Sequence, residues 1–332
     1  MLSRCAGGHA RLARTRAVEL HPLAPRALGG VRHARCSEHD SSMPLRVATA
    51  LVLLFAFFSA GCSTTLSTLQ PAEPMRPGHV QAQAALNVNV PASRIVDAVD
   101  VVATLGDRYV SDPSYKPTTE EQRQALAAGV GLGLSAPGVN PDFMLRMGVV
   151  KDLDVGLRWS GLAAHADAKY RFLSSREPSA EEEEAARGLG NGPDRGFQGA
   201  VSIGISKALY SGFVFDAVDY LEVGDYSRWN VEVPVIFGSR LSDFGHVWFG
   251  PKYVFSTYSV DASLQNIGIV PRSSGTIHHL GAFGGIGVGY KVVFVFTELT
   301  IAKMLAEPEI FGQKTDLGGI VVVPAGGLML RL

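Results

Sequence analysis

Apolar and polar residues alternate through most of residues 143–172. A period of two places successive side chains on opposite faces of an extended strand. The pattern breaks near residues 150–152 and again near Gly161, so it predicts three consecutive strands joined by tight turns. The apolar positions are Phe143, Leu145, Met147 and Val149, then Leu153, Val155, Leu157 and Trp159, and then Ala164, Ala166, Ala168, Tyr170 and Phe172.

The polar face of these three strands indicates their register. Gly161 suits the positive φ of a two-residue hairpin turn, which places Ser160 opposite Ala163. A slip of one residue would turn the apolar side chains to the wrong face and separate opposite charges. Counting back from the turn gives the cross-strand pairs Arg158–His165, Asp154–Lys169 and Asp152–Arg171.

Similar alternation recurs from residue 79 to residue 332. It predicts an all-β fold, an antiparallel up-and-down barrel of about 10–12 strands. Residues 91–127 instead have apolar residues at helical spacing, with a Thr118–Glu121 capping box before a second short helix at 119–127. The other strands are expected at 79–90, 128–135, 197–207, 213–221, 229–240, 246–258, 279–290, 292–303 and 318–332.

Composition excludes several classes of function. The formal net charge of −1 gives no electrostatic basis for nucleic-acid binding. The three cysteines, Cys5, Cys36 and Cys62, have no metal-ligand spacing, and residues 63–332 contain none that could form a disulfide. Nothing in the sequence indicates a cofactor.

The N-terminal part predicts export. Residues 47–60 form an apolar run that is too short to span a bilayer as a helix but has the length of a signal-peptide core. Arg46 precedes the run, and Ser-Ala-Gly61-Cys62 ends it. This ending resembles the lipobox of bacterial lipoproteins. The resemblance implies cleavage between Gly61 and Cys62, and covalent diacylglyceryl and acyl groups on Cys62.

These features divide the chain into four parts. Residues 1–42 are expected to be a disordered extension or an incorrectly assigned start, with translation beginning near Met43; an Arg-rich organellar transit peptide is the competing interpretation. Residues 43–61 are the expected signal peptide and residues 62–78 a flexible, lipidated tether. Residues 79–332 are the expected barrel.

The lipobox and the strand layout together resemble bacterial outer-membrane β-barrel proteins that carry a lipoprotein signal. The resemblance implies an apolar face in contact with outer-membrane lipid and a charged interior, although the chain ends in Leu332 where such barrels usually end in an aromatic residue. The expected interior ladder is Asp152, Asp154, Arg158, His165, Asp167, Lys169 and Arg171. The expected lipid-facing aromatic residues are Phe143, Trp159, Tyr170, Phe172, Trp229, Phe237, Phe249, Tyr253 and Phe255.

The lengths of the predicted connections support this layout. Links such as 241–245 are short, whereas links such as 91–127 and 174–196 are long, and the two kinds nearly alternate. Membrane barrels have short periplasmic turns and longer outer loops. An even number of strands returns both ends of the sheet to the short-turn side, where we expect a lipidated Cys62 to enter the inner leaflet of the outer membrane.

Two other functions are compatible with the alternation. A lipid-tethered soluble barrel or sandwich would turn its apolar faces inward and bind an apolar ligand or partner. A barrel hydrolase active at its rim would use Ser160, His165 and Asp167 as a triad. Arg158 opposite His165 indicates ion pairing instead, so we expect no catalytic residues and a role as a small channel, structural anchor or assembly component.

No metal site is expected either. His278 and His279 are adjacent in a predicted strand and therefore point to opposite faces, where they cannot bind one ion together. The run of four glutamates at residues 181–184 is expected to be a solvated loop or helical turn. The sequence identifies no transported solute and no protein partner.

Overall fold

The computed structural model describes residues 66–112, 114–161, 163–185, 195–208, 221–241, 244–264, 268–269, 273–310 and 313–332. The expected extension, the signal peptide and Cys62 lie outside the described residues. So does the predicted strand at 213–221, except for Leu221, with which a longer strand begins.

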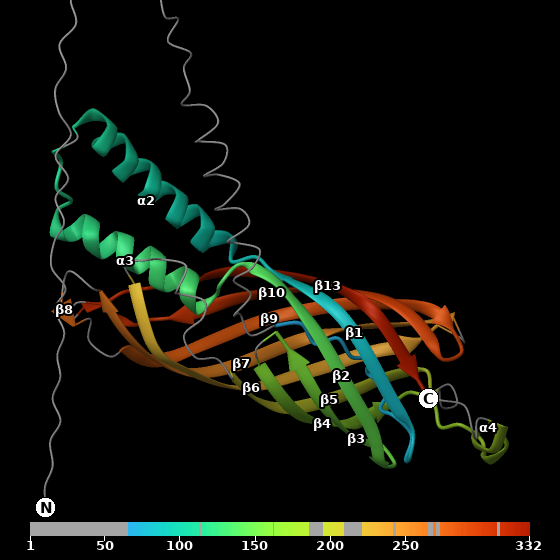
Figure 1. Ribbon diagram of the computed structural model, residues 1–332. Coiled ribbons are helices and arrows are strands. Elements are labelled where there is room, and N and C mark those ends of the chain that lie inside the picture. Colours follow the sequence, from blue (N-terminus) through green and yellow to red (C-terminus); the bar gives the residue numbers. More distant parts are fainter. Residues whose placement is uncertain are drawn as a thin grey trace, which may run out of the picture. The chain divides into compact units, whose positions relative to one another are not determined.

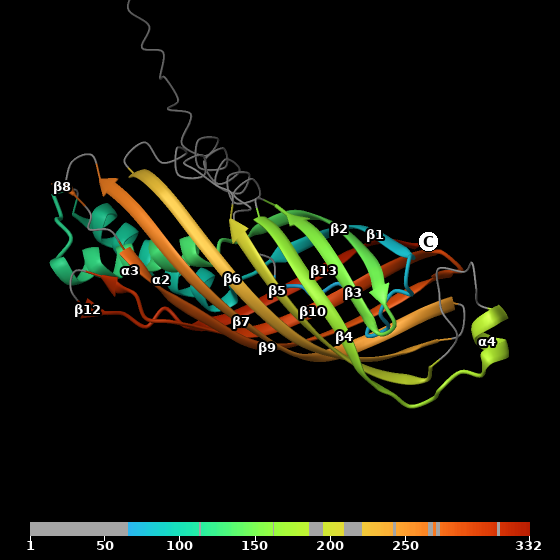
Figure 2. The same cartoon turned by 90° about the horizontal axis from the view of Figure 1, so that it is seen from below.

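Ten antiparallel strands form a closed barrel. Each pairs with its neighbours in chain order, and pairing between β6 and β7 and between β1 and β13 closes the ring. The tilted strands of the meander lie side by side in Figures 1 and 2. The strands are β1 (Val80–Asn89), β2 (Gly138–Val150), β3 (Leu153–Ser160), β4 (Ala163–Ser174), β5 (Phe197–Ala208), β6 (Leu221–Arg240), β7 (Gly245–Leu264), β9 (Ser273–Tyr290), β10 (Val293–Ala306) and β13 (Gly319–Arg331).

Short elements complete the described chain. β8 pairs with the end of β7, and β11 pairs with β12 apart from the barrel. The prediction of an up-and-down barrel of about 10–12 strands is confirmed. The additional elements are α2 (Ala92–Ser111), α3 (Thr119–Leu134), α4 (Ala180–Ala185), β8 (Gly268–Ile269), β11 (Glu309–Ile310) and β12 (Gln313–Lys314).

The two helices α2 and α3 connect β1 to β2. The predicted capping box is present, because the Thr118 hydroxyl accepts the Glu121 N–H and the Glu121 carboxylate accepts the Thr118 N–H. The prediction of a strand at 128–135 is wrong, because residues 128–134 continue α3. Leu126 and Val130 of α3 pack against a buried apolar cluster on the barrel wall. Among the described residues no helix is long and apolar enough to cross a bilayer.

The barrel has two distinct ends. We call the end where β1 begins and β13 ends the terminal end, and the opposite end, which carries α2 and α3, the helix end; the C-terminus and the two helices lie at opposite ends in Figure 1. The tight turns 151–152 and 291–292 lie at the terminal end. Most long links lie at the helix end: 90–137, 209–220, 265–272 and 307–318.

Three links lie at the end opposite to the one predicted. The tight turn at 151–152 and the long link 175–196 lie at the terminal end, and the tight turn that follows Ser160 lies at the helix end. All three changes have the same cause. Because residues 128–134 are helical, strands β2 to β5 run in the direction opposite to the one expected, whereas β6 and the strands after it run as expected. The difference in link length between the two ends is therefore real but less regular than predicted.

The apolar faces of the strands point out of the barrel. Leu157 is 65% exposed and Phe143 is 56% exposed, whereas Asp154 and Lys169 are completely buried in the interior. The predicted cross-strand pairs are observed, including Arg158 opposite His165 and Asp154 opposite Lys169. A soluble barrel with an apolar core requires the reverse arrangement, so that interpretation is wrong.

Candidate functional site: a lumen filled by the N-terminal segment

Residues 66–75, which we call the lumen segment, lie inside the barrel. Every one of them is buried, and they form neither helix nor strand. The flexible tether expected at residues 62–78 is therefore not observed in its described part. Backbone N–H and C=O groups that have no partner in a helix or sheet must bond elsewhere when they are buried. The charged side chains of the barrel wall provide those partners.

Cations bind the start of the lumen segment. Lys252 of β7 donates to the carbonyls of Leu66 (2.9 Å) and Ser67 (3.1 Å). Arg158 of β3 donates to the Ser67 carbonyl (2.8 Å) and also pairs with Asp142 of β2. Lys252 also pairs with Glu232 of β6. Each of the two cations therefore binds both a carboxylate of the wall and a backbone carbonyl of the segment.

An anion binds the middle of the segment. The Glu298 carboxylate of β10 accepts the N–H of Thr68 (2.5 Å) and of Leu69 (2.7 Å). The same carboxylate accepts the indole N–H of Trp248 at 2.8 Å. Glu298 is 2% exposed, and bonds from three N–H donors are what make a buried carboxylate tolerable at this depth.

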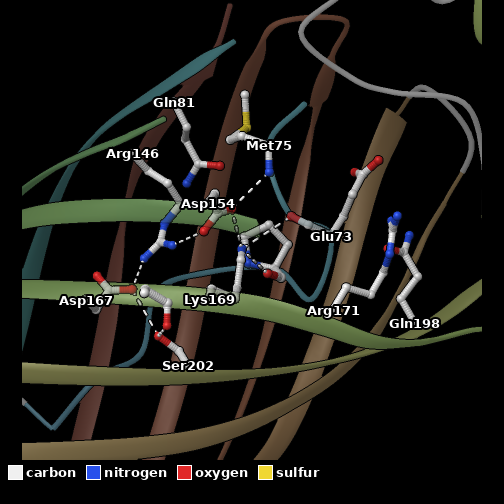
Figure 3. Close-up of polar contacts among 12 residues, drawn as sticks. Glu73, Met75, Gln81, Arg146, Asp154, Asp167, Lys169, Arg171, Gln198 and Ser202 are labelled. Carbon is white, nitrogen blue, oxygen red and sulfur yellow. Dashed lines mark hydrogen bonds and ion pairs between the residues drawn. The ribbon is translucent and has the colours of Figure 1, made fainter. Parts of the chain in front are cut away.

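A network of four charged side chains surrounds the last residues of the segment (Figure 3). Asp154 accepts the Met75 N–H at 2.9 Å and pairs with Lys169 at 3.3 Å and with Arg146. Lys169 donates to the Pro71 carbonyl at 3.0 Å. Arg146 also pairs with Asp167. The ion pairs of the wall therefore extend directly to the backbone of the segment.

The sequence leaves room for this network. Gly156 of β3 faces the interior beside Arg146, where an added Cβ would lie 2.7 Å from both the Arg146 guanidinium and the Asp167 carboxylate. A larger residue would displace one of the two partners. Glycine at this position of a strand marks a close approach of another group.

The chain leaves the lumen at the terminal end. Arg331 of β13 pairs with Glu73 at 2.8 Å. Past Met75 the backbone crosses Gly148 of β2, where the Gly78 N–H donates to the Gly148 carbonyl at 3.0 Å. An added Cβ on Gly148 would lie 2.0 Å from the Arg76 carbonyl oxygen. Only glycine permits this crossing, after which the chain reverses into β1.

All seven residues of the expected interior ladder lie on the inner wall or its rim. Asp152 and Arg171 pair at the terminal end, where Asp152 is partly exposed. The other five are at most slightly exposed, and all have charged partners. The strand parity of Glu232 and Lys252 also predicts an interior position, and the two pair inside the barrel. Sequence reasoning missed the rest of the network, which comes from other strands and from the segment itself: Glu73, Asp142, Glu298 and Arg331.

The residues of the possible hydrolytic triad are not arranged as a triad. His165 Nε2 lies 3.1 Å from Glu232 and 3.7 Å from Asp167. Ser160 is paired in the sheet with Ala163, and its buried hydroxyl has no hydrogen-bond partner among the described residues. Ser160 and His165 line a chamber of about 20 Å³, which has room for about one water molecule.

No metal site is found in the part of the chain that the structure describes, since no three His, Asp or Glu side chains gather there to hold an ion. His279 is buried in the barrel. The neighbouring His278 accepts or donates a hydrogen bond with the Tyr253 hydroxyl at 2.7 Å on the outer surface. The two histidines therefore point to opposite faces, as predicted.

Aromatic side chains on the outer wall form two groups. Near the terminal end, Phe172, Phe197, Phe237 and Phe249 contact one another. Toward the helix end, Trp159, Trp229, Tyr253 and Phe255 face outward. Aromatic residues at both borders of an apolar band are typical of barrels that cross a bilayer.

These features define the class of the molecule: a ten-stranded antiparallel β-barrel with an apolar outer wall and a lumen occupied by its own N-terminal segment. No protein-family model matches the sequence, and no curated protein matches it.

Three solved structures are among those that match the chain. The chain is 10% identical to Neisserial surface protein A over 78% of its length and all of that chain, with a TM-score of 0.30. It is 10% identical to Ail of Yersinia pestis over 77% of its length and 99% of that chain (TM-score 0.24). It is 9% identical to the translocator domain of autotransporter NalP from Neisseria meningitidis over 88% and 98% (TM-score 0.26). The barrel assignment depends on the observed strand pairing, not on these weak similarities.

Proposed function

We propose that the protein is a bacterial outer-membrane β-barrel lipoprotein with a structural, non-enzymatic role. Three features support the proposal: the outward-facing apolar wall, the two aromatic groups that border it, and the lipobox-like sequence that ends in Cys62. Lipid on Cys62 adds an anchor to a barrel that already presents an apolar exterior.

The filled lumen is the observation that carries the structural role. Residues 66–75 occupy the barrel interior and bond to both of its walls, through Lys252 and Glu298 on one side and Asp154 on the other. A ten-stranded barrel leaves only a modest lumen, and this one is occupied by chain. The barrel therefore acts as a rigid, non-conducting body, and a channel function requires the segment to move out.

The small size of the interior chamber favours a non-enzymatic role. A hydrolase must admit its substrate to the nucleophile, and the chamber beside Ser160 and His165, about 20 Å³ in volume, has room for no lipid or peptide. The carboxylates of Asp167 and Glu232 both approach the same nitrogen of His165. This arrangement suits an interior ion-pair network more than a general base.

The experiment compares the natural chain with Cys62→Ser in bacterial cells. We expect incorporation of labelled palmitate into the natural chain only, recovery of both proteins in the outer-membrane fraction, and faster gel migration of unheated than of boiled samples. In planar bilayers the natural protein should produce no steady conductance. Release of Cys62→Ser as a monodisperse soluble protein would contradict the membrane barrel, and a stable conductance would contradict the filled lumen as the resting state.

A further inference from the structure

The lumen segment has a direction. Its first residue, Leu66, packs in the cluster that contains Leu134 of α3 and Met304 near the end of β10, which lie toward the helix end. Its last residue, Met75, bonds to Asp154 at the start of β3, which lies at the terminal end. The chain thus runs through the barrel from the helix end to the terminal end and then turns back into β1.

Chain length limits where the residues before Leu66 can lie. Cys62 is separated from Leu66 by four residue steps, which span at most about 14 Å when fully extended. Residues 66–77 are needed to span the distance from the apolar cluster around Leu66 to the rim at the terminal end, where Pro77 lies beside Gly148. Four residues are too few to cover that distance, and the space along the way is occupied by the segment and the side chains that bind it.

We propose that the chain before Leu66 emerges from the barrel at the helix end, so that Cys62 places its lipid in the leaflet at that end. This leaflet is opposite to the one beside the C-terminus. Since the longer links lie mainly at the helix end, it is the outer leaflet. This inference about the anchor depends on the proposed lipidation of Cys62, whereas the exit of the chain at the helix end does not.

The assignment reverses the expectation from sequence. That expectation placed Cys62 on the short-turn side, because an even number of strands returns both ends of the sheet to that side and residues 62–78 were expected to be a flexible tether. A linker that runs through the barrel has its two ends on opposite sides of the membrane. The lipid anchor and the C-terminus then lie on opposite surfaces.

Single-cysteine labelling tests the exit side. Residues 63–332 contain no cysteine, so a parent chain with Cys5→Ser and Cys36→Ser accepts single reporters. The reporters are Thr65→Cys before the segment, Thr104→Cys on an exposed position of α2, and Lys151→Cys in the exposed turn between β2 and β3. Each is treated with a membrane-impermeant maleimide, first on intact cells and then after the cells are disrupted.

We expect Thr65→Cys and Thr104→Cys to react on intact cells and Lys151→Cys to react only after disruption. Labelling of Thr65→Cys together with Lys151→Cys, and not with Thr104→Cys, would overturn the exit at the helix end. Labelling of Lys151→Cys alone on intact cells would overturn the outer-leaflet assignment. The parent chain separates this test from that of lipidation. A reactive Cys62 in the parent would refute lipidation, and whether that Cys62 reacts on intact cells or only after disruption would then give the exit side.

Discussion

The substitution Glu298→Gln should release the lumen segment while leaving the barrel closed. The carboxylate binds the Thr68 N–H through one oxygen and the N–H groups of Leu69 and Trp248 through the other. An amide has a single acceptor oxygen, so its NH₂ group must face at least one of these donors. The loss of one charge-assisted bond, with a buried donor left unpaired, costs about 2–4 kcal/mol.

That cost corresponds to roughly a 30- to 1,000-fold increase in the population of the open segment. Hydrogen exchange measures it directly, as a matching loss of protection at the Thr68 and Leu69 amides. Glu120→Gln on the exposed face of α3 is the matched control and should change nothing in the lumen. Unchanged protection of the two amides in Glu298→Gln would refute the anchoring role. Equal loss across all barrel strands would show that segment and wall open only together.

Three further predictions concern the outer wall, the chain crossing and the helix cap. Leu157→Arg, on the exposed apolar face, should destabilise the protein in lipid vesicles by about 2–4 kcal/mol in denaturant titrations, whereas an ordinary surface site would change by less than about 0.5 kcal/mol. Gly148→Ala, whose Cβ would lie 2.0 Å from the Arg76 carbonyl, should lower the temperature at which the folded gel band is lost; Gly284→Ala, with no atom nearer than 3.8 Å, should not. The hydrogen bond from Tyr115 is the main cause that lowers the pKa of Glu121 from 4.5 to about 2. The ionised carboxylate therefore stabilises α3 fully above the pKa of the unfolded chain, and this stabilisation is lost as the pH falls through about 2. The helicity of α3 should follow that acid transition by hydrogen exchange, and Glu121→Gln should remove the transition; a transition that persists in the variant would contradict the capping role.

The barrel wall was predictable because its information is local. Alternation assigns the face of each residue, and the turn at Gly161, which has the expected positive φ of 53°, sets the register of β3 and β4. The failure at residues 128–134 is also local in origin. Glycine at every second position imitates a strand, but Leu126, Val130 and Leu134 are four residues apart and form a helical stripe against the barrel. The capping box upstream marks where the helix begins, and the four-residue spacing of these apolar side chains is the signal for how far it extends.

The lumen segment was not predictable from its own sequence. Pro71, Pro74 and Pro77 exclude regular structure, and a proline-rich stretch beside a lipidation motif has the composition of a linker. A signal was present elsewhere in the chain. Glu298 faces the interior, but its partners in the neighbouring strands are Gly285 and Ala325, neither of which can neutralise it. An inward charge without a cross-strand counterpart indicates that something else must enter the barrel.

The pairing of β1 with β13 has a consequence for biogenesis. These first and last strands of the sheet form the seam that completes the ring around residues 66–75. Filling a finished ring would require one end of the polypeptide to be drawn through it. The segment must therefore be in place while the seam is still open, and closure of the seam is the step that retains it.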